Sequence, residues 1–323
     1  MNAENIKKNN SGVRKFMGTY GGLLLVTVLL AVVISVFNPV FMTSSNLLQL
    51  VINNNSVFLA SIGMTFVIIG GGIDLSQGAL AAFSTMVAAL LALAGVNSVF
   101  TVLLTVAIGV GVGIVNGVIV SVGKVHAFIV TLGMTTILRG FAVALYGGYP
   151  VPIDFNNDFI QFGNGTILGV PNVIIICVIV FIASFLLLTK TNTGRNIYAV
   201  GGNPEAARFS GISVVKTSIF SYAYCAGLTA LAGVLMASRM YSGVPNAATG
   251  LETSAITAVI IGGTSFTGGD GNVIGTLIGV ALLGILVNGM VLFGLSEWIQ
   301  NVVSGVIIIF AVIYDRMRRT KNA

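Results

Sequence analysis

Charged side chains are scarce in this sequence. Asp, Glu, Lys and Arg make up only 7% of its 323 residues, whereas soluble domains carry roughly a quarter. Hydrophobic residues make up 56%, too many to leave a water-facing surface around a folded core. Apolar runs recur from Tyr20 to Tyr314, each near the roughly 17 to 25 residues with which a helix crosses a bilayer. The composition excludes a soluble domain and predicts an all-α, polytopic integral membrane protein whose solvent is the lipid bilayer.

Residues that carry out chemistry are also rare. Cys177 and Cys225 lie within apolar runs without the spacing of a zinc site or redox pair, and we interpret both as core residues. No G-x-x-x-x-G-K-[ST] motif occurs, because Gly123-Lys124 lacks both the first glycine and the following hydroxyl residue. With no catalytic triad, metal-ligand spacing or paired carboxylates, the sequence predicts no enzyme, no metal site and no cofactor.

Basic residues lie mostly in short segments between the apolar runs. The net charge of +6 does not predict a nucleic-acid partner, because such a partner needs the bases gathered on one soluble face. If ten spans follow from a cytoplasmic N-terminus, nearly all Lys and Arg residues lie on the cytoplasmic side of the membrane. Arg239 then lies on the outer side, and Arg139 lies within or near the end of a span. This asymmetry predicts an even number of spans with both termini cytoplasmic.

The expected spans define one membrane domain. They are 20–37, 47–69, 73–93, 99–122, 127–146, 171–188, 217–238, 254–266, 273–293 and 298–314. The eighth is too short to cross alone, which predicts a segment that is broken, re-entrant or extended into its flanks. We expect a cytoplasmic tail over 1–19, a transmembrane domain over 20–316 with a cytoplasmic loop over 189–216, and a tail over 317–323. No cleavage signal follows the basic start, so the first span is expected to remain as an anchor.

A short helix is predicted inside the loop 189–216. A cap, a proline in the first turn and a terminal glycine define it, and at about 10 Å it is too short to bury a core of its own. It must therefore dock, either in a groove of a cytoplasmic motor subunit or on the membrane interface. The glycines of 194–202 predict a flexible approach to it. The residues concerned are Asn203, Pro204, Glu205, Ala206, Ala207, Arg208, Phe209 and Gly211.

Polar residues inside the spans are candidates for a translocation path. Asp74 follows three glycines, and we favour a cap at the cytoplasmic surface over a position facing a cavity in the membrane. The amides and hydroxyls either line a wet path or hold helices together. Because few of these groups are ionisable, a neutral hydroxylated substrate fits better than an ion. The candidates are Asn53, Asn54, Asp74, Ser76, Asn116, Thr264, Ser265 and Asn288.

An internal echo is also present. Residues 67–71 and 259–263 share the sequence VIIGG, but the spacing around them differs by about twenty residues. Chance recurrence in a Val-, Ile- and Gly-rich composition explains this equally well, so no repeat is inferred.

Four segments in this order resemble the ribose-type permeases of bacterial binding-protein-dependent ABC transporters. They are GGGIDLS at 70–76, AFIVTLG at 127–133, GRNIYAVGGNPEAARFSGI at 194–212 and AVIIGGTS at 258–265, within a resemblance over 20–316. The resemblance implies a second permease chain, cytoplasmic ATP-binding subunits, a periplasmic or tethered sugar-binding protein, and the bacterial plasma (inner) membrane. It implies import of a monosaccharide, ribose or a related pentose or hexose, and favours motor docking for 203–211.

Two departures from the family pattern leave the cargo open. Ser254 stands where these permeases often carry an acidic residue after Glu252, and Asp270 stands where Lys or Arg is common. An autoinducer-like furanosyl compound or a cyclic polyol is an alternative cargo. An ion-coupled secondary carrier and a non-transporting scaffold are alternative classes, but neither accounts for the capped loop helix.

Overall fold

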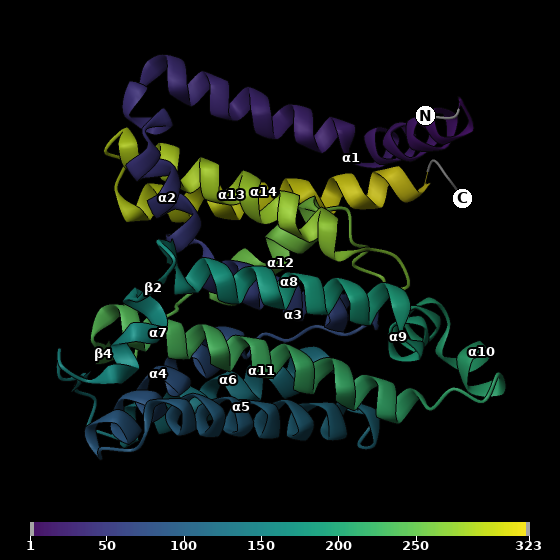
Figure 1. Ribbon diagram of the computed structural model, residues 1–323. Coiled ribbons are helices and arrows are strands. Elements are labelled where there is room, and N and C mark those ends of the chain that lie inside the picture. The colour runs from purple at the N-terminus through teal and green to yellow at the C-terminus, as the bar shows by residue number, and fades with distance from the viewer. Residues whose placement is uncertain (1–2, 321–323) are drawn as a thin grey trace.

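The computed structural model describes residues 3–320 and is almost entirely helical within them (Figure 1). The long helices include α1 (Ala3–Phe37), α5 (Ser98–Ser121), α6 (Ala127–Ala144), α8 (Asn172–Lys190), α11 (Val214–Met240), α13 (Val273–Leu292) and α14 (Glu297–Thr320). The shorter ones are η1 (Pro39–Met42), α2 (Ser44–Asn53), α3 (Asn55–Ile69), α4 (Gln77–Leu93), η2 (Asp158–Ile160), α7 (Gln161–Asn164), α9 (Asn192–Gly202), α10 (Pro204–Phe209) and α12 (Leu251–Ile261). Two-residue strands form two antiparallel pairs, β1 (Val151–Pro152) with β4 (Ser242–Gly243) and β2 (Thr166–Ile167) with β3 (Val170–Pro171).

Each predicted span coincides with a helix or a bent helix pair. Six described helices are long and apolar enough to cross a membrane alone, and α2 with α3, bent by 44°, makes a seventh. The remaining predicted spans correspond to shorter apolar helices: α4, α12 and the part of α14 over Trp298–Ile307. The all-α polytopic membrane fold is therefore confirmed, and the eighth span is short because α12 has only 11 residues.

The two ends of the molecule differ in what they carry. The start of α1 and the end of α14 lie at the same end as α9 and α10, while α7, β4 and the β2–β3 hairpin lie at the other end (Figure 1). The distribution of Lys and Arg in the sequence predicts that the end carrying α9 and α10 is the cytoplasmic one.

Helix α11 forms the centre of the protein. In its most apolar stretch 67% of residues are buried, compared with 17% in α8, so α8 lies nearer the periphery of the bundle. Small residues bring α5 against α11: a Cβ on Gly113 would lie 2.4 Å from the carbonyl oxygen of Tyr222. Close backbone approach through small residues is the usual packing of membrane helices.

The repeated VIIGG sequence has the same local structure at both positions. It ends α3 and α12, and in each case the second glycine is left-handed, with φ of 81° at Gly71 and 89° at Gly263. The N–H groups of this glycine and of the next residue donate to carbonyls three and five residues earlier, at 2.9 to 3.2 Å. Both helices thus stop in a Schellman cap, and non-helical backbone follows.

Candidate translocation and coupling site

The predicted short helix of the cytoplasmic loop is present as α10. The side-chain oxygen of Asn203 accepts from the Ala206 N–H at 3.0 Å, and Pro204 occupies the first helical position. Gly211 follows the helix with φ of 81°. The caps expected from the sequence therefore form, and they fix both ends of a six-residue helix.

One face of α10 is buried, and its other side chains are exposed. Ala207 is 4% exposed, whereas Phe209 is 91% exposed, and the side chains of Glu205 and Arg208 on the same short helix are exposed as well. Aromatic and Arg side chains dominate the binding energy of many protein interfaces. The exposed ring with its flanking charges fits a docking surface, and the docking role itself remains a prediction.

The flexible approach predicted over 194–202 is wrong, because these residues form α9. Thr191 caps the helix by accepting the Gly194 N–H at 3.2 Å, and Ile197 is fully buried. The glycines provide close contact instead of freedom: a Cβ on Gly194 would lie 2.1 Å from the carbonyl oxygen of Leu188. Sequence reasoning took these glycines for a flexible link, although their role is steric.

The C-terminal end of α9 meets two turns in a contact that only glycine allows. We call it the glycine junction; it consists of Gly71, Gly201, Gly268 and Gly269. A Cβ on Gly201 would lie 1.7 Å from the Ile69 carbonyl oxygen and 2.7 Å from the Gly269 nitrogen. The Gly269 N–H donates to that same Ile69 oxygen at 2.8 Å. Helix α9 therefore touches both the turn after α3 and the turn after α12.

Tyr198 strengthens the same contact through its side chain. Its hydroxyl donates to the carbonyl oxygen of Gly271 at 2.6 Å. Burial, with a smaller effect from the charge of Asp270, raises the pKa of Tyr198 to about 12, so the phenol stays protonated near neutral pH. A backbone contact and a side-chain contact thus join α9 to the segment that follows α12.

Two short helices meet end to end inside the protein. Non-helical backbone over 70–76 precedes α4, and non-helical backbone over 244–250 precedes α12. A Cβ on Gly78, in the first turn of α4, would lie 2.2 Å from the carboxylate oxygen of Glu252, in the first turn of α12. Non-helical backbone at membrane depth occurs where protein or a water-filled cavity shields it, and facing half-helix N-termini form substrate sites in transporters.

Contacts with α11 place this meeting point well inside the bundle. Gln77, the first residue of α4, donates from its side-chain amide to the sulfur of Cys225 at 3.1 Å. Cys225 lies eleven residues into α11. At a rise of 1.5 Å per residue, α4 begins about 17 Å from the cytoplasmic start of α11.

Asp74 is fully buried, which contradicts the surface position favoured from the sequence. Its Oδ1 accepts the Ser76 N–H at 2.9 Å and the Ser76 hydroxyl at 2.5 Å, and the Asn116 amide donates to the same hydroxyl at 3.2 Å. The glycines before Asp74 let the chain turn inward: a Cβ on Gly72 would lie 2.6 Å from the Tyr222 hydroxyl. Three predicted path residues, Asp74, Ser76 and Asn116, therefore form one buried cluster.

Arg139 holds the non-helical segment before α12. Its guanidinium donates to the carbonyl oxygens of Ala247 at 2.8 Å and Pro245 at 3.3 Å, and its charge interacts with that of Glu252. Charged residues within membrane spans are costly and usually face a cavity or a partner. A single Arg within an apolar run is a signal that can be read from the sequence, but the position of its partners is not.

Exposed polar side chains surround the same meeting point. Asn246, Thr249 and Thr253 belong to the segment that enters α12, and Thr136 lies on the neighbouring α6; all four are exposed. A cavity of about 60 Å³ beside α12 has a mixed lining, with the hydroxyl residues Thr253, Ser254, Thr257 and Ser304 beside Asn54, Val57, Leu283 and Val287. Such a surface offers hydrogen bonds without charge, which is the chemistry that binds hydroxylated molecules.

Three other predicted path residues lie apart from the Asp74 cluster and form hydrogen bonds of their own. Asn288 and Asn46 exchange two side-chain hydrogen bonds of 3.0 Å, which join α13 to α2. Asn53 accepts from Arg239 at 3.0 Å, and Asn54 donates to the carbonyl of Leu50 at 2.8 Å. These contacts resemble the polar links between membrane helices, and their position along a path remains a prediction.

Thr264 and Ser265 occupy the turn after α12. Both are fully buried, and the Ser265 hydroxyl lies 2.9 Å from that of Thr267. The Ser265 N–H donates to the carbonyl of Asp270 at 2.9 Å, which closes the loop that carries Gly268 and Gly269. These two residues shape one side of the glycine junction.

A second cavity lies between the segment before Asp74 and the start of α10. It has a volume of about 330 Å³ and lies between the 70–72 glycines, α9, the start of α10 and the start of α11. Tyr222 lines it and donates to the carbonyl of Ile73 at 3.1 Å, next to Asp74. The cavity therefore begins where the buried cluster ends and reaches the base of α10.

Comparison with known proteins identifies the class of protein. The family described as "Branched-chain amino acid transport system / permease component" matches residues 46–312, and the chain belongs to this family. The ribose import permease protein RbsC of Escherichia coli (strain K12) is 42% identical over 299 residues, covering 92% of this chain and 93% of the relative. RbsC of Bacillus subtilis (strain 168) is 39% identical over 95% of this chain and 94% of its own length. The D-allose transport system permease protein AlsC of Escherichia coli (strain K12) is 36% identical over 94% and 93%.

The resemblance to ribose-type permeases stated from the sequence is thereby confirmed. No solved structure matches this chain.

Proposed function

We propose that this chain is the membrane-spanning permease subunit of an ATP-driven importer for a monosaccharide, in the plasma (inner) membrane of a bacterium. The observation that carries the proposal is the 36 to 42% identity over more than nine tenths of the chain to permeases named for ribose and D-allose. A permease named for L-arabinose in Azospirillum brasilense is 34% identical over 93% of the chain. A pentose or hexose is therefore the proposed cargo.

The proposed docking site for the cytoplasmic ATP-binding subunit is α10. Its exposed Phe209 supplies an anchor for a pocket, and Glu205 and Arg208 supply flanking polar contacts. The helix is rigidly capped and joined through α9 to the glycine junction. A force applied at α10 would then reach both interrupted membrane segments without passing through a flexible loop.

The proposed translocation path passes the meeting point of α4 and α12. Exposed Asn and Thr side chains there offer neutral hydrogen-bonding groups, and Arg139 and Glu252 offer the charge-assisted bonds that sugar hydroxyls accept and donate. The cavity of about 330 Å³ would be its cytoplasmic continuation. A second permease chain on the side of α6, α12 and α14 would complete the wall of the path.

We propose that the sugar-binding protein docks at the opposite end of the molecule. Tyr149 is 72% exposed, Phe155 78% and Leu168 100%, all in the connection between α6 and α8. Exposed apolar side chains gathered in one loop indicate an interaction site. We assign delivery of the sugar to this surface.

Purification of the tagged chain from its native membrane tests the motor-driven class. Wild type is compared with Phe209→Ala and with the control Ser210→Ala, which changes an exposed neighbour. We expect an ATP-binding subunit to accompany the wild type and the control, and to be lost from Phe209→Ala while the variant keeps its melting temperature.

Uptake of labelled ribose, D-allose and L-arabinose into vesicles containing the purified complex then tests the cargo. Uptake that needs ATP and persists when ion gradients are collapsed supports the importer. Uptake that needs no ATP-binding subunit and stops with the ion gradient would instead identify a secondary carrier. Import of a cyclic polyol or a furanosyl signal in place of these sugars would keep the class and overturn the cargo.

A further inference from the structure

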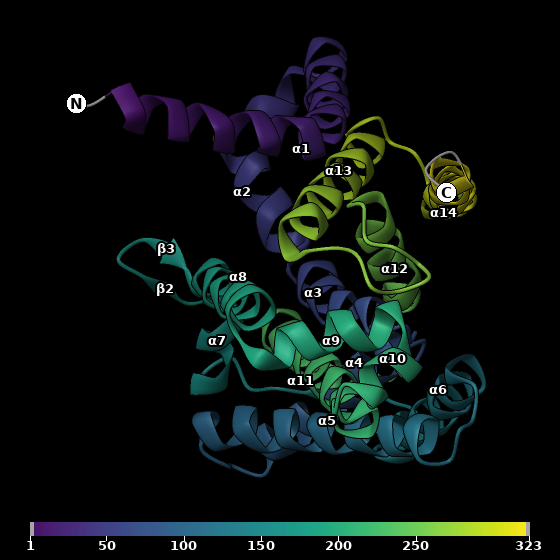
Figure 2. The same cartoon turned by 90° about the vertical axis from the view of Figure 1, so that its right-hand side faces the viewer.

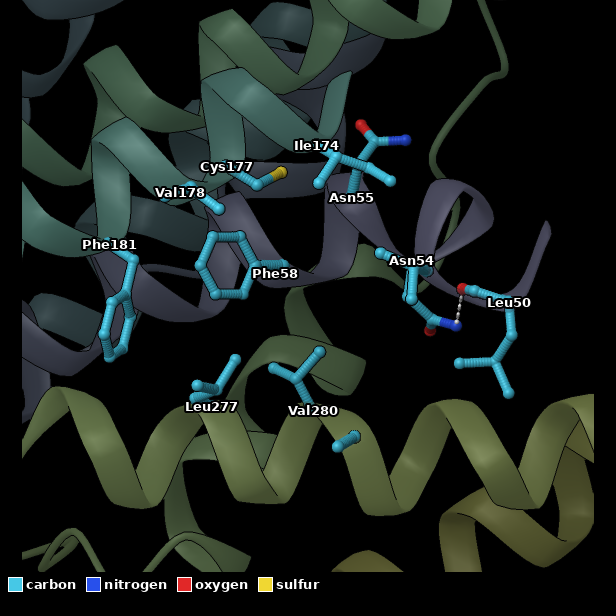
Figure 3. A pocket seen from close by; sticks show the side chains of 12 residues that line it. Leu50, Asn54, Asn55, Phe58, Ile174, Cys177, Val178, Phe181, Leu277 and Val280 are labelled. Atoms are coloured by element: carbon cyan, nitrogen blue, oxygen red, sulfur yellow. Dashed lines mark hydrogen bonds between the residues drawn. The ribbon is translucent and has the colours of Figure 1, made fainter. Parts of the chain in front are cut away.

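An apolar cavity of about 260 Å³ lies beneath the bend between α2 and α3 (Figure 3). Its walls come from this bend, from α8 and from α13, and they include Phe58, Cys177, Phe181 and Ala281. It lies on the side of α8, whereas α6 and α14 lie on the other side of the bundle (Figure 2). The cavity therefore lies on a different side of the bundle from the proposed path, although Asn54 lines both this cavity and the smaller one beside α12.

The lining is almost entirely apolar. Asn54 and Asn55 are the two polar residues among the twelve, and both side-chain amides already donate to carbonyls of their own segment, to Leu50 at 2.8 Å and to Ile52 at 2.6 Å. Figure 3 shows the first of these bonds at the edge of the cavity. A sugar would lose its hydrogen bonds to water here without replacement, so the occupant must be apolar.

The size and the mouth of the cavity indicate where that occupant comes from. Apolar cavities of about 150 Å³ already stay dry and bind small hydrocarbons, and larger unfilled ones destabilise a fold further. Val51, Val178 and Leu277 at the rim are 39 to 51% exposed, and the adjacent Ile179 and Ile182 of α8 are 60% and 52% exposed. In a membrane-spanning chain such an aliphatic rim faces lipid hydrocarbon.

We propose that this cavity is a binding site for one acyl chain of a membrane phospholipid, which fills the wedge under the 44° bend and holds α2 against α8 and α13. A second protein chain is a poorer occupant, because the rim residues are uniformly aliphatic, whereas the exposed polar side chains lie on α6 and at the start of α12. The site is independent of the proposed transport function.

The test uses phosphatidylethanolamine with a diazirine near the end of one acyl chain, incorporated into nanodiscs containing the full-length protein. After photolysis, crosslinked peptides are mapped by mass spectrometry. We expect crosslinks at Phe58, Cys177 and Ala281 to exceed those at Phe100 and Leu103, which are 61% and 58% exposed on α5.

Ala281→Phe, which fills the cavity, should lower the cavity crosslinks at least fivefold and leave those on α5 unchanged. Ala107→Phe, the same substitution on an exposed position of α5, is the matched control and should leave both unchanged. Labelling that follows exposure alone, or that is the same in both variants, would overturn the proposal.

A stability measurement keeps the proposal testable if Ala281→Phe folds poorly. The melting temperature of the delipidated wild type should rise when the same phospholipid is added back. The Cys177→Phe variant, whose cavity is narrower, should show no such rise. An equal gain in wild type, Cys177→Phe and Ala107→Phe would mean general solvation by lipid and would refute a defined site.

Discussion

The glycine junction predicts that one methyl group will uncouple the motor from the membrane path. Gly201→Ala places a Cβ 1.7 Å from the Ile69 carbonyl oxygen, whereas Cβ contacts below 3.0 Å are essentially never seen. Helix α9 must therefore move away by at least about 1.3 Å, and the Ile69 oxygen and Gly269 N–H, now 2.8 Å apart, must separate or shift with it.

The size of the effect follows from the bond that is lost. Leaving a buried donor or acceptor without a partner costs about 1–3 kcal/mol. If this contact carries the coupling, the same free energy corresponds to roughly a 5- to 150-fold change between linked sites. We expect Gly201→Ala to lower sugar imported per ATP hydrolysed by at least about fivefold, with α10 still able to hold the ATP-binding subunit.

Gly202→Ala is the matched control. A Cβ at this position meets no atom within 4 Å, so the same chemical change one residue along should leave import unchanged. The assay measures uptake and ATP hydrolysis in parallel in proteoliposomes containing the whole complex. Equal coupling ratios for Gly201→Ala and Gly202→Ala would refute the junction as the connection between α10 and the path.

Three further substitutions test other parts of the site. Asp74→Leu removes the acceptor of two buried Ser76 groups and should destabilise the protein by about 1–3 kcal/mol for each, read as a lower melting temperature, whereas Asp74→Asn keeps an acceptor and should lose much less. Arg139→Met leaves two backbone carbonyls of the segment before α12 without their donor and should lower uptake with the ATP-binding subunit still bound; unchanged uptake would remove Arg139 from the path. Leu168→Asp should weaken uptake that depends on the sugar-binding protein without changing basal ATP hydrolysis, and an equal loss of both would point to misfolding.

Much of the fold could be predicted because an apolar run in a bilayer must form a helix to satisfy its backbone hydrogen bonds. Each apolar run became a helix, and the short run at 254–266 was correctly expected to be interrupted. The caps of α10 were predictable for a similar reason, since Asn203, Pro204 and Gly211 act on their own backbone within a few residues. Helix length and helix caps depend on residues that are close together in the sequence, so both can be predicted from it.

Contacts between distant segments were not predictable in this way. The three glycines of α9 read as a flexible link, although Gly201 is needed for its contact with Ile69, more than a hundred residues away in the sequence. Asp74 was placed at the surface for the same reason: only the packed structure shows Asn116 and Tyr222 around the segment that carries it. A single sequence determines these long-range contacts, but it does not show which residues contact each other.

The meeting of α4 and α12 also bears on how a sugar can pass without an electrical leak. At this point the positive charge of Arg139 interacts with the negative charge of Glu252, so these two side chains together add no net charge. An ion reaching this point finds no net counter-charge to replace its hydration, whereas a neutral polyol loses only hydrogen bonds that amides and hydroxyls return. Cargo can then cross while the membrane keeps its voltage, which is worth about 2.3 kcal/mol per elementary charge per 100 mV.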